Sequence, residues 1–371
     1  MSVFTGKQFN EKYQSKKFIK LTNESENHNG FLFQTGLNID IIPFNPRGSC
    51  RPGGIYFCEF ERLLTWINYN FEYMCYVRSV KIPDDAQVYE EYYPNKWKAD
   101  KLILGERQEI GALEVWKDIR YCLRAVELDG RLLQYVRDQT QSVCMKAVKQ
   151  DSAALKYVNN QTEDICLAAV NKYGNALEYV RDQTETICME AVKQDSTALK
   201  HVKDQTRVIC LEAVRRNGQM LQYVRDQTEE ICLEAVKQNS AALEYAKDQT
   251  EALCLEAVKG NWYALRYVKD QTEKICLEAV KQYGLALEYV KNQTEAVCLE
   301  AVKQNGLKLR DVKNQSLAIC MSAVQQDESA IYYVKSYHML LLLYIVNKSH
   351  MIFWGLKSTW EYVRKISLYF S

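Results

Sequence analysis

Cysteine recurs at a fixed interval through most of this chain, and that interval limits the possible folds more than any other feature of the sequence. It stands at ten positions, each 22 residues after the last: residues 122, 144, 166, 188, 210, 232, 254, 276, 298 and 320. The neighbours repeat with it, so that "QTEKICLEAVKQ" around Cys276 returns as "QTEAVCLEAVKQ" around Cys298. Such a period is typical of a repeat array, in which each unit packs against the next.

Each unit carries the signals of two short helices. Thr272 can cap a first helix, whose apolar residues fall on one stripe: Ile275, Cys276, Ala279 and Val280. Gly284 is expected to stop this helix in a positive-φ conformation. A second helix, "LALEYVK", is expected to direct three residues inward: Ala286, Leu287 and Val290. Both helices are shorter than the ~12–15 residues of a stable isolated helix, so the pattern predicts an α-solenoid of about ten 22-residue helical hairpins.

The prolines divide the chain, because all five lie between Pro43 and Pro94. We expect a small α+β domain at residues 1–110, the helical repeats at 111–335 and a degenerate C-terminal cap or apolar tail at 336–371. In the first region "GIYFCEF", "YVRSVKIP" and "KADKLILGE" have the composition of strands, and "ERLLTWINYNF" that of a helix. "IPFNPRGSCRPGGIYF" predicts a long loop, with a tight turn at Pro52-Gly53.

The repeated cysteine is expected to fill space in the core. Packed helices lie ~8–10 Å apart, whereas a disulfide requires Cα atoms within ~4.4–6.8 Å, so cysteines one unit apart should not bond. A metal site needs three or four converging ligands, and this series offers one sulfur per layer. The thiol is therefore interpreted as a small buried hydrophobe, and we expect no metal, no cofactor and no catalytic residue.

A residue two positions after the leucine of each second helix gives a candidate partner-binding strip. Packing between repeats is the simpler interpretation of these side chains, and recognition along one face of the array is the functional one. The strip consists of Tyr135, Tyr157, Tyr179, His201, Tyr223, Tyr245, Tyr267, Tyr289, Asp311 and Tyr333. His201 is not expected to act as a catalytic base, because no nucleophile or acid is spaced to serve it.

The junction motif "DQT" or "NQT" predicts a turn followed by a helix cap, and it is compatible with a ladder of glutamine side chains bonded between layers. Charge argues against nucleic acid as a partner. The chain has 48 Lys and Arg against 47 Asp and Glu, and the unit 272–293 has a net charge of zero, whereas a groove that follows phosphates needs surplus cations on one face.

The N-terminus lacks the apolar core of a secretory signal, and the chain has thirteen cysteines, which favours an intracellular, reducing compartment. The tail has a longest apolar run of eight residues, 339–346, too short for a bilayer that needs ~20. A membrane contact through residues 339–365 and a tail changed by a shift of reading frame remain as alternatives to the cap.

The units "TEEICLEAVKQNSAALEYAKDQ" and "TEKICLEAVKQYGLALEYVKNQ" resemble an uncharacterised helical-repeat family of Mimivirus-like giant viruses. "NGFLFQTGLNIDIIPFNPRGSCRPGGIYFCEF" and "VKIPDDAQVYEEYYPNKWKADKLILGE" resemble an N-terminal domain that giant-virus proteins often carry ahead of repeats such as ankyrins. The resemblance implies a viral protein in the host cytoplasm or the virion, and it brings no catalytic residues.

The sequence thus favours a non-enzymatic scaffold that binds a host or viral protein through its repeats. Two alternatives stay open. One is a small, transferase-like enzyme at residues 1–110, which a deep polar pocket beside the loop at residues 45–56 would favour. The other is a peripheral membrane or virion-structural protein that acts through its tail. The partner and the oligomeric state do not follow from the sequence.

Overall fold

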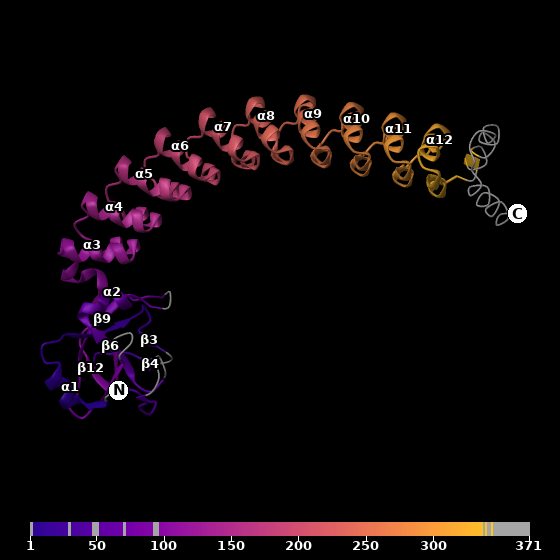
Figure 1. Ribbon diagram of the computed structural model, residues 1–371. Helices are drawn as coiled ribbons and strands as arrows, with labels where there is room; N and C mark the ends of the chain where they lie inside the picture. Colours follow the sequence, from indigo (N-terminus) through magenta and orange to yellow (C-terminus); the bar gives the residue numbers. More distant parts are fainter. Residues whose placement is uncertain are drawn as a thin grey trace. The chain divides into compact units, whose positions relative to one another are not determined.

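The computed structural model describes residues 3–28, 31–46, 52–69, 72–91 and 96–336, together with residues 338, 339 and 343. The chain forms two compact units, residues 1–172 with 179–181 and residues 173–178 with 182–371. The first unit holds a sheet domain and the first repeats, and the second holds the remaining repeats (Figure 1). The domain boundaries expected at residues 110 and 335 stay predictions.

The sheet domain is built on one antiparallel sheet, whose described strands follow the order β1-β10-β11-β6-β2-β9-β12-β5, with β13 paired to β9. These strands are β1 (Val3–Thr5), β2 (Phe18–Thr22), β5 (Gly36–Ile39), β6 (Ile55–Glu59), β9 (Tyr76–Lys81), β10 (Gln87–Glu91), β11 (Lys96–Ala99), β12 (Lys101–Leu104) and β13 (Gln108–Glu109). Two small hairpins pair β3 (Asn27–His28) with β4 (Phe31–Leu32) and β7 (Asn68–Tyr69) with β8 (Glu72–Tyr73).

Aromatic rings form the centre of this domain. Helix α1 (Gly6–Lys12) begins with a capping box, in which Thr5 and Gln8 each accept the other's backbone N–H. The helix places Phe9 against Phe18, with ring centroids 4.9 Å apart, and Phe18 in turn lies 5.2 Å from Trp97. All three side chains are buried, so the core joins α1 to the middle strands of the sheet.

The predicted strands are confirmed, and the predicted helix is shorter than expected. "GIYFCEF" forms β6, "YVRSVKIP" forms β9, and "KADKLILGE" forms β11 and β12 on either side of Asp100. Of "ERLLTWINYNF", residues 60–62 form a 3-10 helix and Leu63–Trp66 form α2, before β7 starts at Asn68. The domain is therefore an antiparallel sheet with little helix. The turn at Pro52-Gly53 relies on glycine, because Gly53 and Gly54 have φ angles of 93° and 134°.

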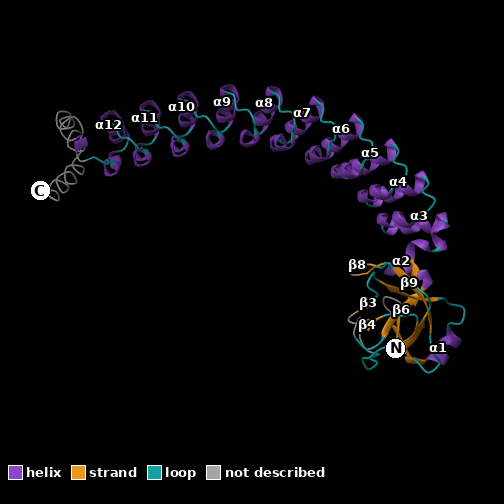
Figure 2. Cartoon of the chain, turned by 180° about the vertical axis from the view of Figure 1, so that it is seen from behind, coloured by secondary structure: helices purple, strands orange, loops and turns teal. Residues whose placement is uncertain are grey.

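Each described repeat consists of a ten-residue α-helix and a six-residue 3-10 helix (Figure 2). The α-helices are α3 (Ile119–Leu128), α4 (Gln141–Gln150), α5 (Glu163–Lys172), α6 (Glu185–Gln194), α7 (Arg207–Arg216), α8 (Glu229–Gln238), α9 (Glu251–Gly260), α10 (Glu273–Gln282), α11 (Glu295–Gln304) and α12 (Leu317–Gln326). The 3-10 helices are η4 (Gly130–Tyr135), η5 (Ser152–Tyr157), η6 (Gly174–Tyr179), η7 (Ser196–His201), η8 (Gly218–Tyr223), η9 (Ser240–Tyr245), η10 (Trp262–Tyr267), η11 (Gly284–Tyr289), η12 (Gly306–Asp311) and η13 (Glu328–Tyr333). Further 3-10 turns, η2 (Ile110–Ala112) and η3 (Glu114–Lys117), precede them.

The predicted core of the repeat is confirmed. Thr272 caps α10 by accepting the backbone N–H of Ile275. The stripe of this repeat is buried, as are the inward residues of its second helix: Ile275, Cys276, Ala279, Val280, Ala286, Leu287 and Val290. Each repeat cysteine is a free, buried thiol, which confirms that it fills space in the core.

The prediction for Gly284 is wrong in its reason. Among the described glycines, positive φ angles occur at Gly36, Gly53 and Gly54, and not in the repeats. The first helix instead ends at an extended residue, Tyr283, whose backbone N–H donates to Ala279. Glycine is favoured at the next position because a neighbouring repeat approaches there: a Cβ on Gly218 would lie 2.3 Å from the carbonyl oxygen of Ala235.

A glutamine in each junction joins its own repeat to the next one. The Nε2 of Gln271 donates to the carbonyl of Leu265 in the same repeat (3.1 Å) and to that of Tyr289 in the following repeat (2.9 Å). Its Oε1 accepts the backbone N–H of Lys291 at 2.9 Å and faces the thiol of Cys276 at 3.8 Å. The same Nε2 bond to the following repeat is made by Gln139, Gln161, Gln183, Gln205, Gln227, Gln249, Gln293 and Gln315. The glutamine ladder that the junction motif suggested is thus present.

A second contact between neighbouring repeats comes in two forms. Where a 3-10 helix begins with Gly218, the Oε1 of Gln238 in the next repeat accepts its backbone N–H at 2.6 Å. The same pairing joins Gly130 to Gln150, Gly174 to Gln194, Gly284 to Gln304 and Gly306 to Gln326. Where the 3-10 helix begins with serine, the partner position holds another residue: Lys172 for Ser152, Arg216 for Ser196 and Gly260 for Ser240. From residue 130 to 260 the two forms alternate.

The tail prediction, whether cap, membrane contact or altered reading frame, falls almost wholly outside the described residues, since nothing after residue 343 is described. Among the helices that are described, none has the length and apolar content to cross a bilayer.

Replacing Gln271 by alanine is expected to loosen the junction between two repeats. The change removes the partners of one N–H and two carbonyl groups, and each group left without a partner costs about 1–3 kcal/mol. Hydrogen exchange of the Lys291 amide, read by mass spectrometry of the full chain, should accelerate by at least tenfold. The exposed Lys281→Ala change, in the same repeat as Lys291, is the control. Equal exchange of Lys291 in both variants would contradict the ladder's role.

Candidate functional site

The exposed side chains of the repeats differ in how much they vary from one repeat to the next. On the α-helices, glutamate stands at the same half-buried position in six consecutive repeats: Glu190, Glu212, Glu234, Glu256, Glu278 and Glu300. On the 3-10 helices of the same repeats, one exposed position holds Lys200, Gln222, Glu244, Arg266, Glu288 and Arg310. A second position, half-buried except at Gln219, holds Thr197, Gln219, Ala241, Tyr263, Leu285 and Leu307. The 3-10 helices thus vary from repeat to repeat, as does one exposed position of the α-helices, which holds Thr186, Val208, Glu230, Ala252, Lys274 and Ala296. We call the outward residues of the 3-10 helices the variable face.

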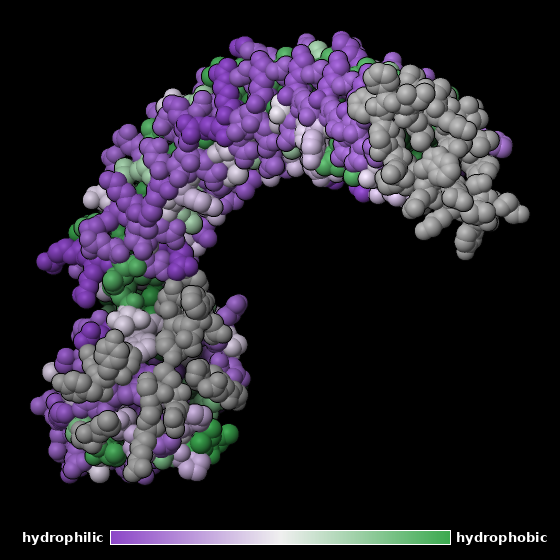
Figure 3. Space-filling model, turned by 45° about the vertical axis from the view of Figure 1, so that its right-hand side comes forward, coloured by the Kyte–Doolittle hydropathy of each residue, from purple (hydrophilic) through white to green (hydrophobic). Residues whose placement is uncertain are grey.

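Several charged residues outside this face have a structural task. The Nζ of Lys291 donates to the carbonyls of Val268 and Lys269, at 3.1 and 2.8 Å, in the preceding repeat. Arg225 makes the equivalent bonds to Val202 and Lys203. These side chains bind the carbonyl groups at the end of a 3-10 helix, which helps to explain why Lys or Arg recurs at this position. The repeats present a mainly hydrophilic surface in Figure 3.

The tyrosines of the predicted strip lie at the edge of the variable face. Each is the last residue of its 3-10 helix, and from Tyr157 onward its backbone carbonyl accepts the bond from the glutamine ladder. Tyr223 and Tyr333 are exposed, and the others are half-buried. Tyr135 packs against Trp116, with ring centroids 5.3 Å apart. Each residue of the strip thus has the same place in its own repeat. The role of the strip in binding stays a prediction.

The two residues that replace tyrosine in the strip have different surroundings. Burial, followed by the charge of Lys200, lowers the pKa of His201, so this side chain is neutral at pH 7. Asp311 forms an ion pair at 2.9 Å with Lys308, which is 3% exposed at a position that holds alanine in most repeats. Glu288 of the preceding repeat also pairs with Lys308, at 3.2 Å. Asp311 is therefore held by a buried lysine, and the two substitutions belong together.

One stretch of the variable face is strongly aromatic. Trp262 stands where the other described repeats have glycine or serine, apart from Glu328 in the last, and its ring lies 5.3 Å from Tyr283 and 6.2 Å from Tyr289. Tyr263 lies 5.3 Å from Tyr289, and the guanidinium of Arg266 lies 4.8 Å over the Tyr263 ring. We call these five residues the aromatic cluster. The sequence did not reveal this cluster, because the tyrosines were grouped by their position in the 22-residue repeat. Three of the five residues nevertheless depart from the repeat pattern.

The repeat cysteines are weak nucleophiles, because their thiols are buried. Burial raises the pKa of Cys276 and Cys320 to about 11, so both remain protonated at neutral pH. Among the described residues, no group of three or more His, Cys, Asp or Glu side chains is placed to hold a metal ion.

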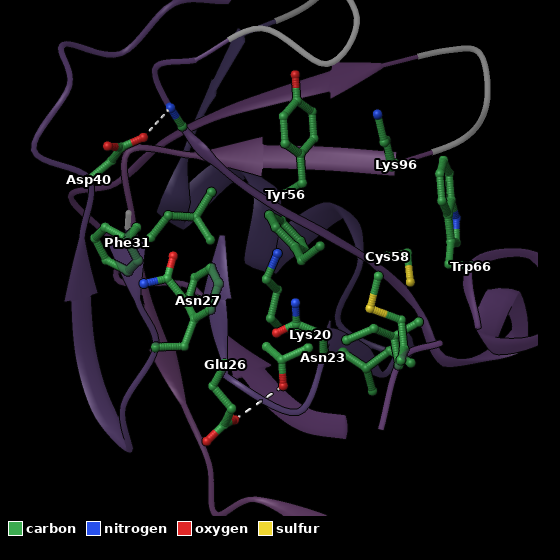
Figure 4. Close-up of a pocket in the computed structure, with 18 of the residues that line it drawn as sticks. Lys20, Asn23, Glu26, Asn27, Phe31, Asp40, Tyr56, Cys58, Trp66 and Lys96 are labelled. Carbon is green, nitrogen blue, oxygen red and sulfur yellow. Dashed lines mark hydrogen bonds between the residues drawn. The ribbon is translucent and has the colours of Figure 1, made fainter. Parts of the chain in front are cut away.

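The sheet domain contains a pocket of about 550 Å³ (Figure 4). It lies beside the loop that ends at Gly54, and β2, β6 and the β3–β4 hairpin line it. Most of the lining is apolar, from Ile19, Phe31, Phe33, Ile55, Tyr56, Trp66 and Met74. Cys58 also lines it, but burial raises the pKa of this thiol to about 12, which leaves it a poor nucleophile. The deep polar pocket that would favour an enzyme is thus replaced by an apolar one.

A buried lysine distinguishes this pocket. Lys20 is 9% exposed, and its Nζ lies 4.6 Å from the centroid of the Phe33 ring. Burial, with a further contribution from the nearby Lys96 charge, lowers the pKa of Lys20 to about 8. Figure 4 shows Lys20 in the middle of the pocket, between Asp40 and Phe31 on one side and Lys96 and Trp66 on the other.

The repeats match a known family model. The domain of unknown function DUF4116 matches residues 140–184, 162–207, 209–250, 228–273 and 250–294. An uncharacterized protein of Acanthamoeba polyphaga mimivirus, R869, is 33% identical over 112 residues, which cover 29% of this chain and 78% of that protein. The chain belongs to this family of Mimivirus-type repeat proteins. The resemblance noted in the sequence is thereby confirmed.

Two other relatives of this Mimivirus-type repeat protein have names that refer to ankyrin repeats, and both come from the same mimivirus. R868 is 32% identical over 108 residues, covering 28% of this chain and 52% of R868. R229 is 31% identical over 132 residues, covering 32% of this chain and 42% of R229. The chain thus spans about half of these two relatives or less. No solved structure matches it significantly.

Replacing Lys20 by methionine is expected to raise the free energy of unfolding at pH 7 and to reduce its pH dependence. The pKa of Lys20 is about 8 in the folded chain and 10.5 for an ordinary lysine. Between these values the unfolded chain binds more protons, so the folded wild type gains stability as the pH rises. The gain is on the order of 3 kcal/mol. Urea unfolding at pH 7 to 10 measures it, with the exposed Lys17→Met as control. Parallel curves for wild type and Lys20→Met would contradict the buried charge.

Proposed function

We propose that this Mimivirus-type repeat protein is a non-enzymatic scaffold that binds a host or viral protein along the variable face of its repeats. The observation that carries the proposal is the contrast between constant and variable positions. The glutamine ladder, the capping threonine and the core residues recur because stacking needs them, whereas the outward residues of the 3-10 helices change from repeat to repeat. Residues that are not needed for stacking can change without loss of the fold, so they can adapt to a partner.

We infer that the repeats within each compact unit stack as an α-solenoid. Support comes from the shared repeat length and from bonds that are the same in each unit: Gln161 donates to Tyr179 as Gln271 does to Tyr289. Stacked repeats of this kind present one extended binding surface. The relatives R868 and R229 are named as putative ankyrin repeat proteins, and ankyrin repeats are another stacked-repeat architecture, which favours the same role.

The aromatic cluster is the proposed centre of binding. Trp, Tyr and Arg are the residues that contribute most often to the energy of protein interfaces, and the cluster combines all three. Tyr283 leaves 47% of its surface exposed, so part of this aromatic area is open to a partner. The tyrosine strip from Tyr135 to Tyr333 would extend the contact on either side. We place the protein in the host cytoplasm or the virion, in line with its free, buried thiols.

Removing the aromatic cluster is expected to abolish partner binding while the fold is kept. The variant Trp262→Gly, Tyr263→Leu, Arg266→Glu gives this repeat the residues that the next repeat has at Gly284, Leu285 and Glu288. Full-length wild type and variant would be used to capture partners from infected amoebae, with quantitative mass spectrometry. The partner should fall at least tenfold with the variant.

The matched control changes the α-helix of the same repeat as Trp262, with Glu256→Ala and Lys259→Ala, and should leave capture within twofold of wild type. Loss of the partner with this control, and not with the cluster variant, would place binding on the α-helical face and refute the proposal. A partner that follows residues 1–110 alone would move the binding function to the sheet domain.

A further inference from the structure

The pocket of the sheet domain is independent of the variable face and points to a different kind of ligand. Its volume of about 550 Å³ lies within the usual range for sites of small organic molecules. Aromatic side chains from three segments meet there, with Phe31 and Phe33 from the β4 region, Tyr56 from β6 and Trp66 from α2. Such walls suit a ligand with a flat or bulky apolar body.

The charges on the pocket wall leave one lysine without an anion. Glu26 is bound by Arg78, at 2.8 and 2.9 Å. Lys96 forms an ion pair with Glu91 at 3.3 Å. The carboxylate of Asp40 accepts the backbone N–H groups of Ile42 and Gly54, at 2.9 and 2.6 Å.

Lys20 differs from these groups, because it has no hydrogen bond or ion pair with any residue that the structure describes. Its neighbour is the ring of Phe33, which gives a weak attraction to a cation. More than nine tenths of the side chain is buried. A buried ammonium ion in this setting is costly unless an anion approaches it.

We propose that this pocket binds a small organic anion that carries one acidic group on an apolar body, with the acidic group against the Lys20 ammonium. One acidic group matches one lining cation that has no carboxylate of its own. The apolar body lies against the aromatic walls, where it displaces water from Phe31, Tyr56 and Trp66. A neutral ligand of the same shape would fill the pocket and leave the lysine charge uncompensated, so the anion binds more tightly.

The pairing is tested with two fluorescent probes that share a body and differ in charge. Anilinonaphthalene sulfonate carries one acidic group, and N-phenyl-1-naphthylamine carries none. Both would be titrated against the full-length wild type, Lys20→Met and Lys17→Met at pH 7. We expect Lys20→Met to weaken sulfonate binding at least tenfold and neutral-probe binding less than threefold. Lys17→Met, at an exposed position that does not line the pocket, should behave as wild type.

A second variant and a second probe keep the outcome decisive. Lys20→Arg retains the cation and should retain sulfonate binding within a few-fold, and circular dichroism of each variant checks its fold. Dansylglycine, a carboxylate with a similar body, tests whether the site accepts carboxylates as well as sulfonates. The proposal is overturned if Lys20→Met weakens both kinds of probe equally, if it weakens neither, or if the wild type binds neither the sulfonate nor the carboxylate saturably.

Discussion

The repeats depend on one bonded side chain, the junction glutamine. A ten-residue α-helix and a six-residue 3-10 helix are each too short to persist alone, and the extended residues between them have backbone groups that regular structure does not satisfy. Gln271 provides hydrogen-bond partners for such groups in both repeats. Its amide nitrogen donates to carbonyls of two repeats, and its oxygen accepts a backbone N–H of the following repeat. Because the bonds cross the junction, the position of each repeat is fixed by its neighbour and not by its own helices.

This arrangement separates the residues that build the repeats from those that are free to do something else. Caps, core residues, the junction glutamine and the basic residue that binds the preceding carbonyls have little freedom to change. Among the residues that remain are those on the outward side of the 3-10 helices, where Trp262, Tyr263 and Arg266 gather. In the sheet domain the aromatic core borders the apolar pocket that Lys20 lines, because Phe33, Ile55 and Phe57 belong to both.

How much the sequence could predict depended on how local each signal was. The 22-residue period, the Thr272 cap and the buried stripe follow from neighbouring residues, and all were confirmed. The role of Gly284 could not be predicted from neighbouring residues. It has the sequence signal of a helix stop, but the repeat that follows lies against the place where its side chain would be. The pocket was out of reach, because Lys20, Tyr56 and Lys96 lie on strands whose pairing joins distant parts of the chain. The residues of the aromatic cluster could be seen in the sequence as departures from the repeat pattern. That they lie together follows only from their arrangement in space.

The alternation of glycine and serine at the start of the 3-10 helices bears on how such a chain can change its length. The backbone N–H of Gly218 donates to Gln238 of the next repeat, whereas the side chain of Ser240 lies against Gly260 of the next repeat. The interfaces between residues 130 and 260 are therefore of two kinds. Loss or duplication of a single unit there would bring a glycine interface and a serine interface into conflict. Loss or duplication of two units would restore both. A change of length by two units, 44 residues, therefore keeps every interface in this part of the chain with its own kind of partner, whereas a change by one unit does not.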